Sequence, residues 1–290
     1  MRVVLLMVLF RALPVFAKPP MPLRVGITTS VNDSRVTVQA EAFAEWVKQA
    51  TGRETRAEVF PDYDGLANAL ADGKLDVALM GPLTFLRAEA NGKVEPLARA
   101  VRAGYASYRA VLFAKGDTPL QDLAAIARAK NLKVGWVDSS SASGHVFPKH
   151  LLLTQKIDPA QVFVTQDFAG SHVAVCKGVL QGKWDVGATF TDAPSSVAKP
   201  TITGCVEGLG KRAATLHIIA TTQDIPSDAL VVRADLEPAL KKKLRQTALS
   251  LASTDAGKQV LSNAFFAESF AAVSVADYEP VRGALDIFKK

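Results

Sequence analysis

The sequence predicts an α/β protein built from two similar lobes, and three observations support this. Strand-like and helix-like segments alternate along the chain, as they do in domains whose helices cover a sheet. The same alternation begins again in the second half of the chain. Each half also closes with a helix, a Gly-Lys pair and a strand, in ADGKLDVA at 71–78 and LQGKWDVG at 180–187. A chain of 290 residues is long enough for two such lobes.

The first half contains three expected strands with helices between them. Helical periodicity is clear where Phe43 and Trp46 share an apolar face, and Gly52 marks the end of that helix. Strands that alternate with helices in this way pair in parallel. The expected elements are a strand at 23–27, a helix at 39–49, a strand at 56–60, a helix at 64–71 and a strand at 76–80.

The second half repeats this order with one irregularity. Pro148 lies a few residues into an expected helix, so we expect the first turn of that helix to be irregular. Sheets of this kind bind ligands beyond the carboxyl ends of their strands, which makes the cleft between the lobes the expected binding place. The expected elements are a strand at 132–137, a helix at 145–156, a strand at 162–164, a helix at 171–181 and a strand at 184–189.

The composition excludes several classes of protein. Hydrophobic residues make up 49% of the chain and charged residues 21%, which argues against disorder. The formal net charge is +6, and the dense basic run at 241–245 fits the solvated face of a helix, so we expect no nucleic-acid partner. Two cysteines and four scattered histidines do not form a metal module, and we expect no cofactor.

The first residues have the pattern of a secretory signal peptide. Arg2 precedes a short apolar run at 3–10, and small residues end the segment at Ala17. We expect residues 1–17 to be removed on export, although Arg11 interrupts the apolar stretch. Cys176 and Cys205 would then lie in an oxidising compartment. A disulfide between them and two separate thiols are both open at this point, because sequence does not supply the geometry of the pair.

Five segments resemble, in consistent order, the periplasmic phosphate-, phosphite- and phosphonate-binding proteins of ABC transporters. The resemblance runs from about residue 23 to residue 288. It implies an α/β type II periplasmic-binding-protein fold, in which two α/β lobes joined by a double-crossing hinge close over one small ligand. The segments are LRVGITTS at 23–30, PDYDGLANALADGKLDVALMGPLTFLRA at 61–88, SSSASGHVFP at 139–148, GSHVAVCKGVLQGKWDVGATFTDA at 170–193 and VSVADYEPVRGAL at 273–285.

The resemblance also implies the boundaries of the lobes. The first lobe would hold residues 22–110 together with 222–290, and the second lobe residues 111–221. The two hinge crossings would lie near 108–111 and 220–222. The closing segment around Tyr278 would be structural and would tie the last helix to the first lobe.

Residues 139–144 form the first candidate site. Serine hydroxyls and the free amides of a helix start are donors for an oxyanion, although an ordinary serine-capped helix start is the alternative. The resemblance implies that Ser141, Ala142 and Ser143 hold a phosphonate, with Ala142 in place of the family's threonine, so that one hydroxyl contact is missing. It also implies that His172 donates to the phosphonate oxygens, whereas the residues alone equally fit an exposed histidine in the first turn of a helix.

Four further positions match cleft residues of the family. Two tyrosines and two carboxylates would suit an ammonium group, so an aminoalkylphosphonate is the favoured ligand, unless a carboxyl takes up a proton to bind the anion. Asp228 also fits a local turn role, and Asp192 a helix cap. After Gly81, the backbone amide of Leu83 or Thr84 could face the ligand. The four positions are Tyr63, Tyr105, Asp192 and Asp228.

We therefore expect a periplasmic binding protein for a small ligand, without enzymatic activity. It would capture a phosphonate, phosphite or phosphate ion and deliver it to an ABC permease, as a monomer. The alternative is a sensor that signals to a membrane histidine kinase; the family's arsenite-responsive branch of this type relies on a cleft cysteine, and neither cysteine here lies in a cleft motif. An enzyme with Ser143 as nucleophile and His172 or His145 as base is disfavoured, because the G-x-S-x-G elbow is absent.

Overall fold

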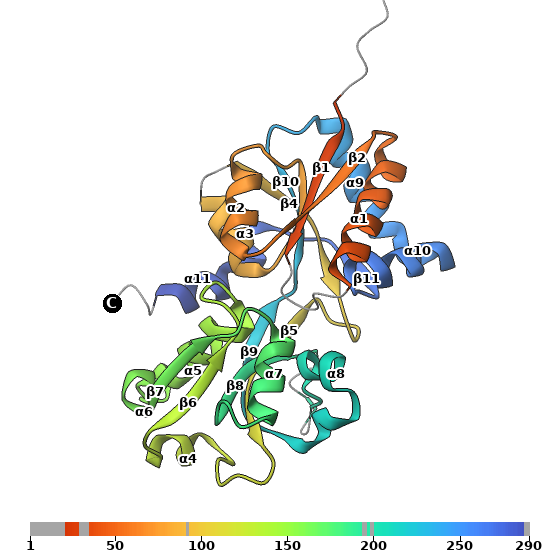
Figure 1. Cartoon of the computed structure of the whole chain (residues 1–290). Helices are drawn as coiled ribbons and strands as arrows, with labels where there is room; N and C mark the ends of the chain where they lie inside the picture. Colours follow the sequence, from red (N-terminus) through yellow and green to blue (C-terminus); the bar gives the residue numbers. More distant parts are fainter. Residues whose placement is uncertain (1–20, 29–34, 91–92, 193–195, 198–199, 287–290) are drawn as a thin grey trace, which may run out of the picture.

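The computed structural model describes residues 21–28, 35–90, 93–192, 196–197 and 200–286. The expected signal peptide at 1–17 lies outside these residues. Within the described part, no helix combines the length and the apolar character that crossing a membrane requires. The described chain forms two sheets, each covered by helices, one above the other in Figure 1.

The first sheet has six strands in the order β11-β4-β10-β3-β1-β2. Strand β1 pairs in parallel with β2 and β3, and β10 runs antiparallel between β3 and β4. We call this sheet and its helices the first lobe. Its strands are β1 (Leu23–Thr28), β2 (Thr55–Phe60), β3 (Val77–Met80), β4 (Val94–Val101), β10 (Ala229–Arg233) and β11 (Ser269–Ala271).

The helices of the first lobe bury an aromatic cluster against this sheet. Phe43 and Trp46 of α1 pack edge-to-face on Phe265, with ring centroids 5.4 and 5.2 Å away. Helix α1 ends at Gly52, whose φ of 73° lies in the left-handed region that glycine tolerates best. The helices are α1 (Val36–Thr51), α2 (Tyr63–Ala71), α3 (Pro82–Ala90), α9 (Pro238–Ser250), α10 (Asp255–Val260) and α11 (Glu279–Asp286), with short turns η3 (Leu251–Ser253), η4 (Leu261–Phe265) and η5 (Val275–Tyr278).

The second sheet has five strands in the order β7-β6-β8-β5-β9. We call it and its helices the second lobe. Its strands are β5 (Ser107–Lys115), β6 (Leu132–Trp136), β7 (Phe163–Phe168), β8 (Val186–Thr191) and β9 (Leu216–Pro226). Its helices are α4 (Leu123–Arg128), α5 (Phe147–Thr154), α6 (Pro159–Val162), α7 (His172–Leu180) and α8 (Thr203–Leu209), with short turns η1 (Ala142–Val146) and η2 (Gly210–Thr215).

The two lobes share one arrangement, as predicted. In each, the first strand of a β-α-β-α-β unit lies between the other two, and all three are parallel: β2-β1-β3 in one lobe and β7-β6-β8 in the other. The helix expected at 145–156 is divided, because η1 is a π-helical turn and α5 begins only at Phe147. Pro148 lies at the start of α5, where its missing N–H costs nothing.

The chain changes sheet at two places that lie side by side. It leaves the first sheet after β4, at 102–106, and returns between β9 and β10, at 227–228. Strands β5 and β9 pair antiparallel from Ser107 with Pro226 to Lys115 with Leu216, which keeps both connections adjacent. The hinge positions expected at 108–111 and 220–222 therefore lie within β5 and β9, a few residues from the change of sheet. The exact residue boundaries of the lobes stay a prediction.

The last helix closes on the first lobe. Tyr278 is fully buried, and its hydroxyl donates to the backbone oxygen of Ser227, 2.9 Å away, next to the returning connection. Its ring packs edge-to-face on Phe85 of α3, with centroids 4.8 Å apart. The C-terminal segment is thus held by the first lobe.

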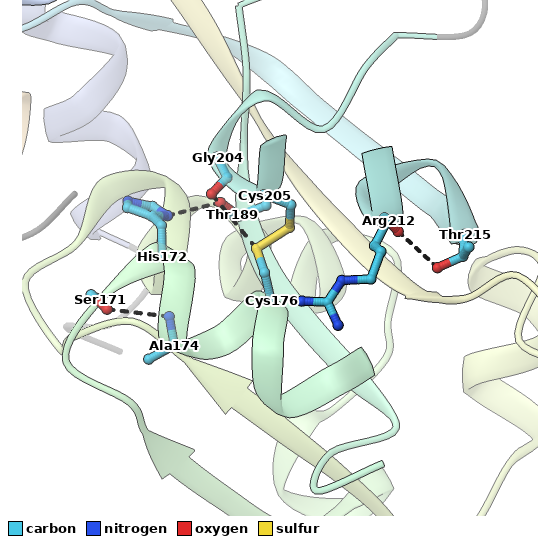
Figure 2. The surroundings of a disulfide bond; sticks show 9 residues. All are labelled: Ser171, His172, Ala174, Cys176, Thr189, Gly204, Cys205, Arg212 and Thr215. Atoms are coloured by element: carbon cyan, nitrogen blue, oxygen red, sulfur yellow. Dashed lines mark hydrogen bonds between the residues drawn. A yellow bond between two sulfur atoms is a disulfide. The ribbon is translucent and has the colours of Figure 1, made fainter. Parts of the chain in front are cut away.

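A disulfide joins Cys176 of α7 to Cys205 of α8 (Figure 2), which answers the question that the sequence left open. Their Cα atoms are 5.4 Å apart and both residues are buried. The bond holds α8, which begins beside the binding cavity described below, against the helix that carries His172.

We expect the double variant Cys176→Ala/Cys205→Ala to lose about 3–4 kcal/mol of stability, because the bond closes a loop between positions 29 apart. Urea unfolding followed by circular dichroism measures the loss. Wild-type protein reduced under denaturing conditions is the control and should show the same lower midpoint. An unchanged midpoint in the double variant would mean that the bond does not constrain the unfolded chain.

Candidate functional site

A cavity of about 500 Å³ opens between the two sheets. The end of β1 and the segments after β2 and β3 line it from the first lobe, and the segments after β6, β7 and β8 line it from the second. The carboxyl ends of both sets of parallel strands therefore meet at one place, as expected for sheets of this type. Its lining includes seven of the expected residues: Tyr63, Ser141, Ala142, Ser143, His172, Asp192 and Asp228.

The serine-rich loop after β6 presents hydrogen-bond donors to this cavity. Ser141 Oγ accepts the Gly144 amide at 3.0 Å and so begins the π-helical turn η1. The amides of Ala142 and Ser143 have no hydrogen-bond partner within the described chain. The hydroxyls of Ser143 and Tyr108 share a hydrogen bond. The loop thus offers unpaired backbone donors next to serine hydroxyls that are already held in place.

His172 is the first residue of α7 and is buried rather than exposed, with 5% of its surface accessible. Its Nδ1 lies 2.9 Å from Thr189 Oγ1, and its ring packs edge-to-face on Phe190 with centroids 4.9 Å apart. Burial lowers the pKa of His172 from its usual 6.5 to about 4, so the ring is neutral at neutral pH. A neutral ring that accepts the Thr189 hydroxyl hydrogen at Nδ1 carries its own hydrogen on Nε2, as a donor.

The tyrosines divide between the cavity and the surface. Tyr63, at the start of α2, lines the cavity and is half-buried. Tyr105 lies outside the lining and is 45% exposed. It follows a two-residue turn in which Ala103 and Gly104 have φ of 48° and 78°, and this turn directs it away from the cavity. A ligand contact by Tyr105 stays a prediction that this arrangement does not favour.

Tyr108 of β5 lines the cavity instead. Burial raises its pKa well above the ordinary value, and the nearby carboxylate of Asp228 raises it further. The phenol therefore stays protonated and can donate a hydrogen bond. The sequence analysis placed Tyr108 only at the hinge, because a strand was not expected to carry it into the cleft.

Asp228 is paired with a residue that the sequence analysis missed. Arg102 Nη2 lies 2.7 Å from Asp228 Oδ2, and both side chains are at most 30% exposed. Arg102 also donates from Nε to the Phe266 oxygen at 2.7 Å and from Nη2 to the Phe265 oxygen at 3.2 Å. No sequence motif marks this arginine, since it follows a strand, β4, that was not expected.

Asp192 follows β8 directly and is half-buried. Burial raises the pKa of its carboxyl, Arg102 lowers it, and Asp228 raises it again, with a net increase. Its backbone amide donates to the Thr203 hydroxyl at 3.1 Å. Asp192 and Asp228 thus face the same guanidinium, and part of the cavity is an electrostatic network of these three side chains.

Thr84 is a second missed side chain, on the first-lobe side of the cavity. It lies in the first turn of α3 and is 1% exposed. Its hydroxyl is buried without a hydrogen-bond partner in the described chain, which costs stability unless something in the cavity pairs with it. The sequence analysis considered only the amides of this turn.

Comparison with known proteins identifies the family. A family model for the periplasmic phosphonate substrate-binding proteins of ABC transporters matches residues 25–278. The chain belongs to this family. It is 28% identical over 272 residues to the phosphonates-binding periplasmic protein of Escherichia coli (strain K12), an alignment that covers 92% of this chain and 77% of that one.

Solved structures of binding proteins show the same fold. The binding-protein component of an ABC phosphonate transporter from Pseudomonas aeruginosa superimposes with a TM-score of 0.79 at 25% identity, over 93% of this chain and 87% of the other. PhnD1 of Prochlorococcus marinus, solved with methylphosphonate, gives a TM-score of 0.79 at 20% identity, over 92% and 98%. The type II fold of two α/β lobes is thus confirmed. The protein is a periplasmic substrate-binding protein of a phosphonate ABC transporter.

The buried, neutral His172 predicts how the stability of this binding protein depends on pH. Below pH 6.5 the unfolded chain takes up a proton at this position, and the folded chain does not until about pH 4. The free energy of unfolding should therefore fall by about 3 kcal/mol between these pH values through this residue. Urea titrations at several pH values should show a smaller fall for His172→Gln. Identical pH dependence in both proteins would contradict a neutral, buried ring.

Proposed function

We propose that this binding protein holds the oxyanion of a phosphonate, phosphite or phosphate in a neutral seat. The seat is formed by the amides of Ala142 and Ser143, the hydroxyls of Ser141 and Ser143, and the Nε2 hydrogen of His172. The observation that carries the proposal is the set of unpaired donors directed to one cavity: two amides of η1 and the buried imidazole.

Neutral donors of this kind suit reversible capture. Hydrogen bonds from fixed dipoles to a charged oxygen are stronger than neutral pairs, and the seat itself adds no full positive charge. The donors are held before a ligand arrives, since Ser141 is bound by Gly144, Ser143 by Tyr108, and His172 by Thr189. Little conformational entropy is then lost on binding.

The first lobe would contribute the remaining contact. Thr84 of α3 lines the cavity, and its buried hydroxyl has no hydrogen-bond partner in the described chain, so a small movement on ligand binding would let it donate to the ligand. A ligand that pairs with Thr84 and with the seat joins both lobes, which is how such a protein couples ligand binding to lobe closure. Tyr63 and Tyr108 would complete the cage around the ligand.

The further expectations are consistent with this role. The chain would be exported to the periplasm, lose its signal peptide near Ala17, and deliver its ligand as a monomer to the permease of the transporter. The alternative, a sensor that signals to a membrane histidine kinase, would need a cleft thiol if its ligand were arsenite. Both cysteines of the chain are joined in one buried disulfide and neither lines the cavity. We therefore favour transport.

Replacing Ser143 or His172 by Ala should weaken methylphosphonate, phosphite or phosphate binding, whichever is tightest in the wild type, by about ten- to a hundredfold. Each change removes a hydrogen bond to a charged oxygen. His145→Ala is the matched control: it lies on the same turn η1, contacts Trp136 and Phe168, and does not line the cavity. Isothermal titration calorimetry measures the affinities. Undiminished binding in both variants would place the oxyanion elsewhere.

Thr84→Val tests the first-lobe contact, because valine keeps the shape and removes the hydroxyl. The variant should be as stable as the wild type or more so, since a buried hydroxyl without a partner is lost. Its affinity for the same ligand should fall about tenfold. Thermal unfolding without ligand and calorimetry with ligand separate the two effects. Lower stability with unchanged affinity would show that Thr84 is structural.

A further inference from the structure

The cavity contains a cation of its own, Arg102. Arg102 pairs with Asp228 at 2.7 Å and donates to the backbone oxygens of Phe265 and Phe266. These contacts come from the connection between β9 and β10 and from the end of η4, so the guanidinium is held by two separate segments.

The charges of Asp192 and Asp228 are already countered by this guanidinium. Burial alone would lower the pKa of Arg102, but the carboxylates of Asp228 and Asp192 raise it above its ordinary value. An ammonium group of a ligand would have to share these carboxylates with Arg102. In a half-buried site the repulsion between two cations is strong, and displacing Arg102 would leave it buried and unpaired.

The surfaces around this ion pair are largely apolar. Phe190 and Val206 line the cavity from the second lobe, and Leu79, Phe265 and Phe266 from the first. An alkyl or aryl group bound there would leave water for apolar surface, which stabilises binding by about 0.8 kcal/mol for each buried CH₂.

The cavity is also large for a phosphonate with one carbon. Its volume of about 500 Å³ falls within the range of roughly 300–1,000 Å³ that is typical of sites for drug-sized ligands. The lobes already touch beside it, because the Ser140 hydroxyl of the second lobe donates to Asp64 Oδ1 of the first at 3.0 Å. Asp64 is itself paired with Arg87. The volume is therefore that of a form in which the lobes are in contact.

We propose that the bound phosphonate carries an uncharged, apolar substituent longer than methyl, and not an aminoalkyl chain. This inference rests on the proposed function, because it assumes that the phosphonate oxygens lie in the serine and histidine seat. It replaces the ammonium cage expected from the sequence, in which Asp192 and Asp228 had no partner of their own.

Propylphosphonate and aminoethylphosphonate test the inference directly, since their chains have equal length and differ in a methyl or an ammonium end. By calorimetry on the full chain, propylphosphonate should bind at least tenfold more tightly than aminoethylphosphonate and severalfold more tightly than methylphosphonate. Tighter binding of aminoethylphosphonate would overturn the inference and leave the proposed function standing. Tighter binding of methylphosphonate than of propylphosphonate would also overturn it. Failure of all three to bind would overturn the inference, and if phosphite and phosphate did not bind either, the proposed function would be overturned as well.

Two variants test the part played by Arg102. Arg102→Met removes the internal cation and leaves Asp228 unpaired, so aminoethylphosphonate should now bind more tightly than propylphosphonate. Adding Asp228→Asn and Asp192→Asn removes both carboxylates too, and the preference for propylphosphonate should return. An unchanged preference in Arg102→Met would contradict the role of the ion pair. Circular dichroism confirms folding, and if the variants do not fold, the ligand pair on wild-type protein still decides.

Discussion

The ion pair of Arg102 and Asp228 lies at the point on which the rest of the binding site depends. Arg102 directly follows β4, where the chain leaves the first sheet, and Asp228 directly precedes β10, where the chain returns. A half-buried ion pair is stable only when its remaining hydrogen-bonding groups are also satisfied, and here the backbone oxygens of Phe265 and Phe266 accept from the same guanidinium. Arg102 thereby contacts the second connection between the lobes through Asp228 and the aromatic wall of the cavity through Phe265 and Phe266. In the inference above, its charge also disfavours a cationic group on the ligand.

The position of the cavity follows from the repeated topology. In both lobes a β-α-β-α-β unit directs the carboxyl ends of three parallel strands to the cleft, and the pairing of β5 with β9 keeps the two units facing each other. Helices α3, η1 and α7 begin close to these strand ends, so the hydrogen-bond donors of their first residues lie around one cavity. Both lobes supply polar groups to the cavity lining. The serine loop and His172 come from the second lobe, and Thr84, whose hydroxyl has no partner in the described chain, comes from the first. A ligand that satisfies both sets joins the lobes.

Two kinds of polar group line this cavity, namely neutral hydrogen-bond donors and charged side chains that are paired with each other. The seat consists of neutral donors, with a histidine whose pKa is lowered by burial and a tyrosine, Tyr108, whose pKa is raised by burial and by Asp228. The full charges are paired with each other, where Arg102 faces Asp192 and Asp228. The disulfide between α7 and α8 holds the second-lobe wall next to His172. In the proposed function, fixed dipoles would bind the oxyanion, and the charged groups of the protein are already paired with each other.

The sequence by itself determined the repeated strands and helices of the two lobes, and it indicated the donors of the proposed seat. Hydrophobic periodicity, glycine ends and the serine run are local signals, and Ser141, Ala142 and Ser143 are neighbours in the chain, so one loop carries them together. Only the tertiary structure decided that Tyr108 and not Tyr105 lines the cavity, because the backbone angles of Ala103 and Gly104 set the direction of that turn. It also decided the partner of Asp228, since Arg102 lies 126 positions away. Such a pair exists because β4 and β10 lie side by side in the first sheet, and no local pattern records which distant strands will meet.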